Sequence, residues 1–401
     1  MKKVFLVDGK RSPIGSFMGS LRTVEAGDLG AVVLKELLEK NNVPKDKIDE
    51  VIVGNILPAG AGQGVARQAS IKAGVPEEVV AYGINMVCGS GMKSVMSAYA
   101  NIRAGLHNLV IAGGVESMSN APFLVSSKIR DGVKMGDFNL VDHMIKDALT
   151  DVFSNTHMGI TAENIASRYQ ISREAQDKFA YESQQKAIKA VDSGIFKEEI
   201  IPITIKLRKS EFVFENDEYP NRTTTLEKMS NLRPAFKKDG LVTAANSSGI
   251  NDGSSFVIVA SEDAVKQYGF VPKAEIIAIG QGGVDPQYMG MGPVPAIRNA
   301  LLSAGITLEE IDVLELNEAF SAQSLAVVQE LAKEHNLSKE KLLSITNMNG
   351  GAIALGHPVG ASGNRIIVTL LHQMIRKNAK YGLASLCIGG GMGTAVILKL
   401  V

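Results

Sequence analysis

The feature that most restricts the folds open to this chain is a repeated order of motifs near its two ends. The apolar run Ile48–Asn55 is echoed by Ile311–Asn317, and both runs end in asparagine. The small-residue turn Cys88–Gly91 is echoed by Gly360–Gly363, and after each turn come a helical pattern and a strand that ends in Gly-Gly. A duplicated α/β half is the simplest explanation of both echoes.

Short apolar runs alternate with helical patterns in the first part of the chain. Val4–Val7 and Glu50–Val53 are predicted strands, and Ala26–Glu39 and Gln68–Ala73 are predicted helices. This alternation is typical of βαβ units, in which helices cover both faces of a sheet. The predicted fold class is therefore α/β.

Residues 119–246 interrupt this rhythm. Ile171–Val191 is a predicted long polar helix, with Ser172 as its N-cap and Gly194 just past its end. Residues 206–238 carry an excess of basic side chains, which fits either a solvated surface or contacts with an anionic ligand. We predict an N-terminal half at 1–118 plus 247–268, an inserted loop domain with ligand contacts at 119–246, and a C-terminal half at 269–401.

The composition argues against several kinds of partner. The 401 residues include 42 Lys and Arg and 42 Asp and Glu, so no net charge would attract nucleic acid or an anionic membrane. No run approaches the roughly 20 apolar residues of a membrane span. The apolar run Val4–Val7 is too short for a secretory signal, and no transit peptide is apparent. We therefore expect a cytoplasmic protein.

The chain has two cysteines, Cys88 and Cys387. A structural disulfide fits poorly with a cytoplasmic protein, and two inert buried thiols are the plain alternative. Cys88 follows the extended apolar segment Val79–Val87 and precedes a helical pattern that runs to Gly105. It is therefore predicted beside a helix N-terminus, where the dipole and free N–H groups favour a thiolate and can hold an oxyanion.

Two other motifs place a reactive side chain among small residues. His357 lies between glycine and proline, which leaves room for a ligand, although a lone histidine can equally be a hydrogen-bonded structural residue. Cys387 ends an apolar strand and precedes the glycine turn Gly389–Gly391, which offers a backbone N–H beside the thiol. No helix follows that turn, as a dinucleotide site would require. Neither cysteine has a second ligand at metal-site spacing, so we predict no metal.

Taken together, these motifs resemble the thiolase family, in the family's order and along the whole sequence. The resemblance implies a duplicated, layered αβαβα core of two five-stranded halves with an inserted α/β loop domain, and commonly a homotetramer. The matching boxes are Val7–Gly15, Val87–Gly91, Asn317–Phe320, Gly350–Gly363 and Cys387–Gly393.

The resemblance also implies catalytic roles. Cys88 would carry the acyl group as a thioester after activation by His357, and Cys387 would remove an α-proton from a second acetyl-CoA. One oxyanion hole would use His357 and a water held by Asn317, and the other the backbone N–H groups of Cys88 and Gly389. No metal or nucleotide cofactor is implied, because the thioester itself acidifies the α-carbon.

The box His157-Met158-Gly159 resembles the biosynthetic, short-chain thiolases. It implies reversible Claisen condensation of two acetyl-CoA into acetoacetyl-CoA and CoA, with Met158 filling the acyl pocket and His157 near the pantetheine, where Ser248 would meet an amide. The residues implied to line the CoA tunnel are Leu149, Phe236, Ala244, Ser248, Met289, Ala319 and Phe320.

Two positions depart from the family pattern. Asn221 stands where the family frequently has arginine, and Arg222, one place on, is the alternative contact for the CoA phosphates. Residues 332–346 form a segment that is longer than in many relatives and has no predicted role.

Three alternatives stay open on sequence grounds. A longer-chain 3-ketoacyl-CoA thiolase would share the catalytic motifs, but His157-Met158 disfavours it. A decarboxylating ketoacyl synthase would need another histidine where Asn317 stands. A non-catalytic acyl-CoA carrier on the same scaffold would have lost a catalytic residue, and none is missing.

Overall fold

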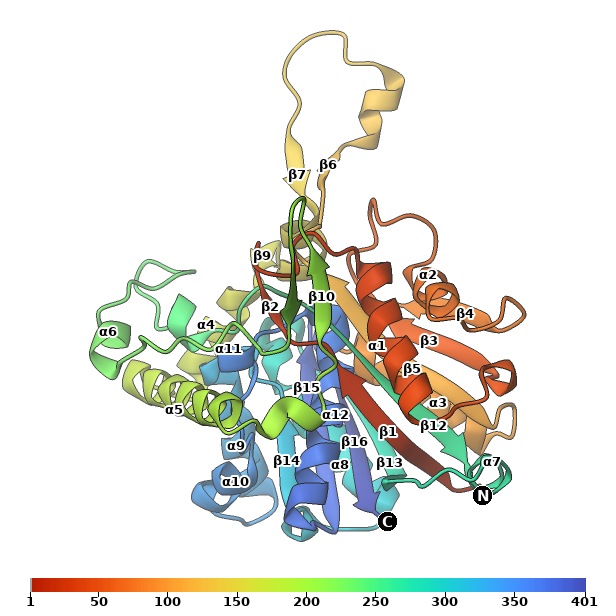
Figure 1. Ribbon diagram of the computed structural model, residues 1–401. Helices are drawn as coiled ribbons and strands as arrows, with labels where there is room; N and C mark the ends of the chain where they lie inside the picture. Colours follow the sequence, from red (N-terminus) through yellow and green to blue (C-terminus); the bar gives the residue numbers. More distant parts are fainter. Residues whose placement is uncertain (1) are drawn as a thin grey trace.

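The computed structural model describes residues 2–401 and contains a ten-stranded sheet with helices on both sides (Figure 1). The strand order is β14-β15-β16-β13-β1-β12-β5-β3-β4, and β2 pairs with β12. The strands of the N-terminal half are β1 (Val4–Arg11), β2 (Gly15–Ser16), β3 (Glu50–Gly54), β4 (Val80–Ile84), β5 (Leu109–Ser117) and β12 (Asn251–Ser261). Those of the C-terminal half are β13 (Ala274–Gly283), β14 (Val313–Leu316), β15 (Tyr381–Ile388) and β16 (Met392–Leu400).

The two halves repeat the same strand pairings, which confirms the predicted duplication. In the first, β3 is parallel to β5, and β12 is antiparallel to both β5 and β1. In the second, β14 is parallel to β15, and β16 is antiparallel to both β15 and β13. The halves join where β1 pairs with β13. In place of a fifth strand, the C-terminal half has a parallel bridge between Leu314 and Thr346, at the end of the segment 332–346.

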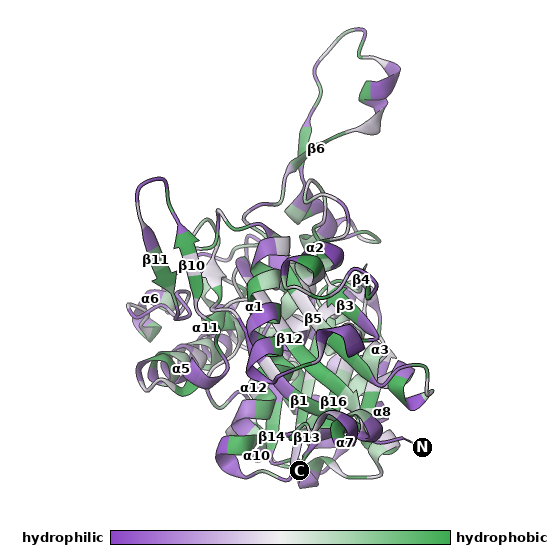
Figure 2. Cartoon of the chain, turned by 45° about the vertical axis from the view of Figure 1, so that its right-hand side comes forward, coloured by the Kyte–Doolittle hydropathy of each residue, from purple (hydrophilic) through white to green (hydrophobic). Residues whose placement is uncertain are grey.

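Five layers of secondary structure result, as predicted. Helices α3 (Ser90–Arg103) and α12 (Val359–Lys377) lie between the two halves, and α12 is buried along almost its whole length. Helices α1 (Ala26–Lys40) and α2 (Val65–Lys72) cover the outside of the first half, and α8 (Pro293–Ala304) and α9 (Ser321–Glu334) that of the second. The apolar strands are sandwiched between these layers (Figure 2). The remaining elements of the two halves are α7 (Glu262–Tyr268), α10 (Lys339–Ile345), α11 (Ala352–Leu355), η1 (Lys45–Lys47), η6 (Pro286–Met291) and η7 (Leu308–Glu310).

Residues 119–246 form their own small elements. The strands of this segment pair only in three separate two-stranded sheets among the described residues. The predicted polar helix is α5 (Arg173–Asp192), and Ser172 caps it as expected, with its Oγ accepting from Ala175 N at 3.2 Å. The exact boundaries of an inserted domain stay a prediction. The other elements are β8 (Thr150–Asp151), β9 (Thr156–His157), β10 (Ile203–Lys206), β11 (Glu211–Phe214), the π-helix η3 (Met144–Leu149), η4 (Ile195–Glu198), η5 (Ala244–Asn246), α4 (Met158–Arg168) and α6 (Leu226–Ser230).

An arm made of β6 (Phe123–Val125), η2 (Ser127–Asp131) and β7 (Leu140–Asp142) projects from the body of the molecule (Figures 1 and 2). It carries exposed apolar side chains, including Met135, which is 96% exposed, and Phe138. Exposed apolar surface of this kind usually marks an interaction site. Among residues 2–401, no helix has the length and apolar character needed to cross a membrane.

Candidate active site

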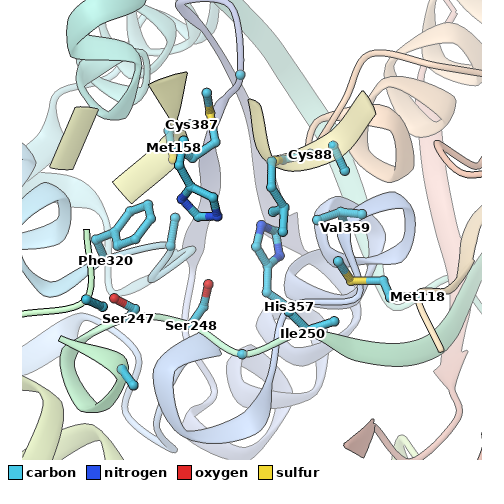
Figure 3. Close-up of a pocket in the computed structure, with 18 of the residues that line it drawn as sticks. Cys88, Met118, Met158, Ser247, Ser248, Ile250, Phe320, His357, Val359 and Cys387 are labelled. Atoms are coloured by element: carbon cyan, nitrogen blue, oxygen red, sulfur yellow. The ribbon is translucent and has the colours of Figure 1, made fainter. Parts of the chain in front are cut away.

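A cavity of about 380 Å³ is lined by residues from both halves and from the inserted segment (Figure 3). Nearly every predicted site residue contributes to its wall. The predicted catalytic residues there are Cys88, His357, Cys387 and Gly389. The predicted substrate residues there are Leu149, His157, Met158, Phe236, Ala244, Ser248, Met289, Ala319 and Phe320.

Cys88 lies on a strained turn between β4 and α3. The preceding residue, Val87, has φ of +46°, which is unfavourable for a β-branched side chain. Ser90 holds the turn, because its Oγ accepts from Met86 N at 2.8 Å and donates to the Val87 carbonyl at 2.6 Å. The thiol thus lies two residues before the first residue of α3, facing the cavity.

Desolvation decides the charge of Cys88. It raises the pKa of this thiol to about 11, although the backbone N–H groups of Gly389 and of Cys88 itself act to lower the pKa. The sequence led us to expect that the helix N-terminus favours a thiolate, whereas burial acts in the opposite direction and raises the pKa of this thiol. The backbone N–H groups of Gly389 and Cys88 nevertheless converge near the sulfur, as an oxyanion hole requires.

His357 is buried, and hydrogen bonds hold both its backbone and its ring. Its backbone N–H donates to Asn251 Oδ1 at 2.9 Å, and its ring Nδ1 lies 2.6 Å from Ser362 Oγ. The preceding Gly356 has φ of +106°, and a Cβ there would lie 2.5 Å from Asn251 Cγ, so only glycine fits. Desolvation, helped by the charge of Arg365, lowers the pKa of His357 to about 3. The ring is therefore neutral and able to accept a proton.

Cys387 ends β15 in the second half and is 1% exposed. Desolvation, together with the nearby Cys88, raises the pKa of its thiol. The turns that carry the two cysteines touch, because a Cβ at Gly89 would lie 2.3 Å from Ile388 Cδ1. Glycine at position 89 lets the two turns meet without displacing the Ile388 side chain. The two thiols are free and not paired as a disulfide.

The wall of the cavity that packs with Cys387 is aromatic and apolar. The rings of His157 and Phe236 stack with centroids 4.7 Å apart, and Phe236 meets Phe320 edge to face at 6.2 Å. His157 Nδ1 accepts from Gly159 N at 3.0 Å, and burial lowers its pKa, so this ring is also neutral. Such a wall suits an extended, uncharged chain such as an acyl-pantetheine arm.

Met158 separates the cavity from a second space of about 230 Å³. Gly389 and Ala148 also line both spaces, and Met158 Sδ would lie 3.6 Å from a Cβ placed at Gly389. The second space is lined partly by Val87 and Val152, but also by the polar residues Lys146, Asp147, Thr150 and Asp151. Met158 is therefore a partition between the two spaces.

Two predicted site residues lie outside the cavity wall. Asn317 is buried at the end of β14, and neither its Oδ1 nor its Nδ2 has a hydrogen-bond partner in the protein. Since buried amides are normally hydrogen-bonded, both polar atoms of this side chain can bind an ordered water. Arg222 forms an ion pair with Asp192 at 2.6 Å and lines an adjoining groove of about 550 Å³, which shares Tyr219 and Ala244 with the cavity.

Sequence reasoning missed several residues of the wall. Met118 directly follows β5, and Ile250 directly precedes β12. Because neighbouring strands bring such ends to one edge of a sheet, the strand order would have indicated them. Val359 and Ser247 are sequence neighbours of predicted residues. In the part of the chain that the structure describes, no group of three or more His, Cys, Asp or Glu side chains is arranged to hold a metal ion.

A thiol, a neutral histidine and convergent N–H donors that line one cavity are suited to acyl transfer. The family model "Thiolase, N-terminal domain" matches residues 4–263, and "Thiolase, C-terminal domain" matches residues 270–400. The chain belongs to the thiolase family.

Relatives of known name agree with this assignment. The chain is 52% identical to an acetyl-CoA acetyltransferase of Cupriavidus necator, with 100% of each chain covered. The solved structure of an acetyl-CoA acetyltransferase from Syntrophomonas wolfei superimposes with a TM-score of 0.96 at 41% identity, covering 100% of both chains. Human mitochondrial 3-ketoacyl-CoA thiolase, solved in complex with CoA, gives a TM-score of 0.93 at 43% identity, covering 100% of this chain and 98% of that one.

Proposed function

We propose that this thiolase is an acetyl-CoA C-acetyltransferase, which condenses two acetyl-CoA into acetoacetyl-CoA and CoA and catalyses the reverse thiolysis. The observation that carries the proposal is the partition formed by Met158 beside Gly389, which limits the space next to the two thiols to a short acyl group. The names of the bacterial relatives support the same substrate.

The first half-reaction transfers an acetyl group to Cys88. His357 accepts the thiol proton, and the sulfur attacks the thioester carbonyl carbon while the N–H groups of Cys88 and Gly389 stabilise the oxyanion. The CoA sulfur leaves with the bonding electrons and must take up a proton. Cys387 holds a proton, and giving it to the departing CoA leaves Cys387 as a thiolate.

The second half-reaction forms the carbon–carbon bond. The Cys387 thiolate takes an α-proton from the second acetyl-CoA, and burial, which raises its pKa, makes it a strong base for this weak carbon acid. Protonated His357 and a water on Asn317 stabilise the enolate oxygen. The enolate carbon attacks the acetyl carbonyl, the Cys88 sulfur leaves as a thiolate and regains its proton from His357, and acetoacetyl-CoA is released. No metal or nucleotide cofactor takes part, because the thioester provides the acidity of the α-carbon.

The CoA molecule lies along the apolar wall around His157 and Phe236, with its pantetheine arm near Ser248. Its phosphates lie toward the adjoining groove that contains Arg222. This placement is supported by the shared lining of the two spaces. Arg222 would have to leave or share its partner Asp192 to reach a phosphate.

The assembly is a homotetramer in the cytoplasm. Two unpartnered surfaces support an oligomer: the arm with Met135 and Phe138, and the edge strand β4, where Val80 is 62% exposed. A reducing compartment is supported by the chemistry, which needs both cysteines as free thiols.

One assay tests the function. The purified protein is given acetoacetyl-CoA or 3-ketohexanoyl-CoA with CoA, and cleavage is measured for each. We expect clear preference for acetoacetyl-CoA. Equal or better cleavage of the six-carbon substrate would indicate a longer-chain thiolase instead. Cleavage of neither substrate would indicate a non-catalytic protein that only binds acyl-CoA. Mass spectrometry after brief exposure to labelled acetyl-CoA should find the acetyl group on the Cys88 peptide.

A further inference from the structure

The ring of His357 has one side-chain neighbour that can decide which of its nitrogens carries the proton. Ser362 is fully buried in the first turn of α12, and its Oγ lies 2.6 Å from His357 Nδ1. The same Oγ lies 2.9 Å from the carbonyl oxygen of Pro358. Asn251 binds the backbone of His357 and leaves the ring alone.

A hydroxyl has a single hydrogen, so these two contacts are not independent. If Ser362 donates to the Pro358 carbonyl, its oxygen accepts N–H from Nδ1, and Nε2 of the neutral ring is left bare. If Ser362 donates to Nδ1 instead, the ring proton is on Nε2. Only the first arrangement lets Nε2 accept a proton from Cys88.

The duplicated half contains a direct precedent for the first arrangement. Ser90 in the turn Cys88–Gly91 occupies the position that Ser362 occupies in the echoed turn Gly360–Gly363. Ser90 Oγ accepts from Met86 N at 2.8 Å and donates to the Val87 carbonyl at 2.6 Å. Because a backbone N–H can only donate, the direction of this chain of hydrogen bonds is fixed.

We propose that Ser362 is a positioning residue that keeps neutral His357 in the tautomer with its proton on Nδ1, through a hydrogen-bond chain from the ring to Ser362 to the Pro358 carbonyl. The inference rests on the proposed function for the role of Nε2, which faces the reaction. Each half thus uses an equivalent serine, one to shape the Cys88 turn and one to orient His357.

The tautomer matters because the protonated ring is strongly disfavoured. Besides desolvation, the positive charge of Arg365 lowers the pKa of His357. The charge of Glu116 raises the pKa of Cys88. His357 therefore accepts a proton only at a correctly presented nitrogen and returns it readily. After that transfer Nδ1–H still donates to Ser362 Oγ, and the new Nε2–H is free to donate to a substrate oxygen.

The test compares Ser362→Ala with a matched control, Ser94→Ala. Ser94 is also fully buried in a central helix, and its Oγ donates to the Gly91 carbonyl at 2.8 Å, but no histidine is bonded to it. The rate of Cys88 acetylation is followed by rapid quenching with labelled acetyl-CoA. We expect a loss of about 10- to 100-fold for Ser362→Ala, as is usual for partners that orient a histidine, with unchanged acetyl-CoA affinity. The control should keep the wild-type rate, and Ser362→Thr, which retains the hydroxyl, should recover part of the loss.

A second readout does not depend on turnover. Histidine labelled with 15N reports the tautomer of each ring, and His357→Gln assigns the signal. We expect Nδ1–H in the wild type and a shift toward Nε2–H in Ser362→Ala. An Nε2–H ring in the wild type, or equal acetylation by Ser362→Ala and the wild type, would overturn the proposal. If wild-type Cys88 takes no acetyl group, the proposed function fails, while the tautomer measurement still decides the role of Ser362.

Discussion

Replacing Met158 by alanine should change the choice of acyl chain. Met158 is 8% exposed and separates the cavity of about 380 Å³ from the space of about 230 Å³ behind it. Truncation to alanine removes the thioether and its methyl group and joins the two spaces. A six-carbon ketoacyl group, which carries two more methylenes than acetoacetyl, could then extend past Gly389.

The size of the effect follows from the lining of the second space. Each methylene moved from water into an apolar site contributes about 0.8 kcal/mol, so two contribute about 1.6 kcal/mol, or roughly 15-fold. Lys146, Asp147 and Asp151 make the far part of this space polar. If only one methylene is well buried, the gain is about fourfold. We therefore expect the C6-to-C4 ratio of kcat/KM to rise by about 4- to 15-fold.

The assay is thiolysis of acetoacetyl-CoA and 3-ketohexanoyl-CoA by the same preparation. The ratio is insensitive to the fraction of folded protein, which is important because truncating a buried methionine destabilises by about 2 to 5 kcal/mol. Met158→Leu preserves the volume of the partition and should leave the ratio unchanged. Met289→Ala enlarges the first cavity without opening the second. An unchanged ratio in folded Met158→Ala, or an equal rise in Met289→Ala, would refute the partition.

Three further predictions follow from the site and the surface. Alkylation of Cys88 by iodoacetamide in the free enzyme should rise about tenfold per pH unit through pH 7 to 10, because desolvation raises its pKa to about 11; a plateau near pH 7 would mean a resting thiolate. Cys387→Ser should still gain acetyl at Cys88 but lose condensation, whereas equal loss of both half-reactions would make Cys387 a packing residue. Met135→Ser with Phe138→Ser should weaken the oligomer in sedimentation without unfolding the subunit, because both side chains are more than half exposed, and an unchanged mass would remove the arm from the assembly.

The motifs could indicate which turns meet at the cavity, because each motif consists of residues that are adjacent in sequence. Cys88, His357 and Cys387 each lie on a short turn at the end of a strand or the start of a helix, and the duplication indicated that these turns correspond. The duplicated layers follow from the same strand rhythm. The sequence could not indicate that the C-terminal half has a single bridge from Leu314 to Thr346 in place of a fifth strand. One bridged residue produces no apolar pattern.

The remaining features depend on distances that no local pattern contains. The pKa of Cys88 reflects the removal of water by many side chains, which local sequence around the helix N-terminus does not indicate. The positive φ of Val87 contradicts the usual preference of a β-branched residue and is imposed by the hydrogen bonds of Ser90. Arg222 was placed by its position in a motif, and its pairing with Asp192, thirty residues away, was not foreseeable.

The contact between Gly89 and Ile388 has a consequence for how the protein matures during synthesis. One catalytic turn is synthesised early and the other about 300 residues later, so no nascent chain can be active before both turns have emerged from the ribosome. Strand β1 likewise gains its partners only when β12 and β13 have emerged. Pairings this distant in sequence slow folding and leave apolar edges exposed meanwhile. The first half of the chain is therefore the part that a chaperone would need to hold.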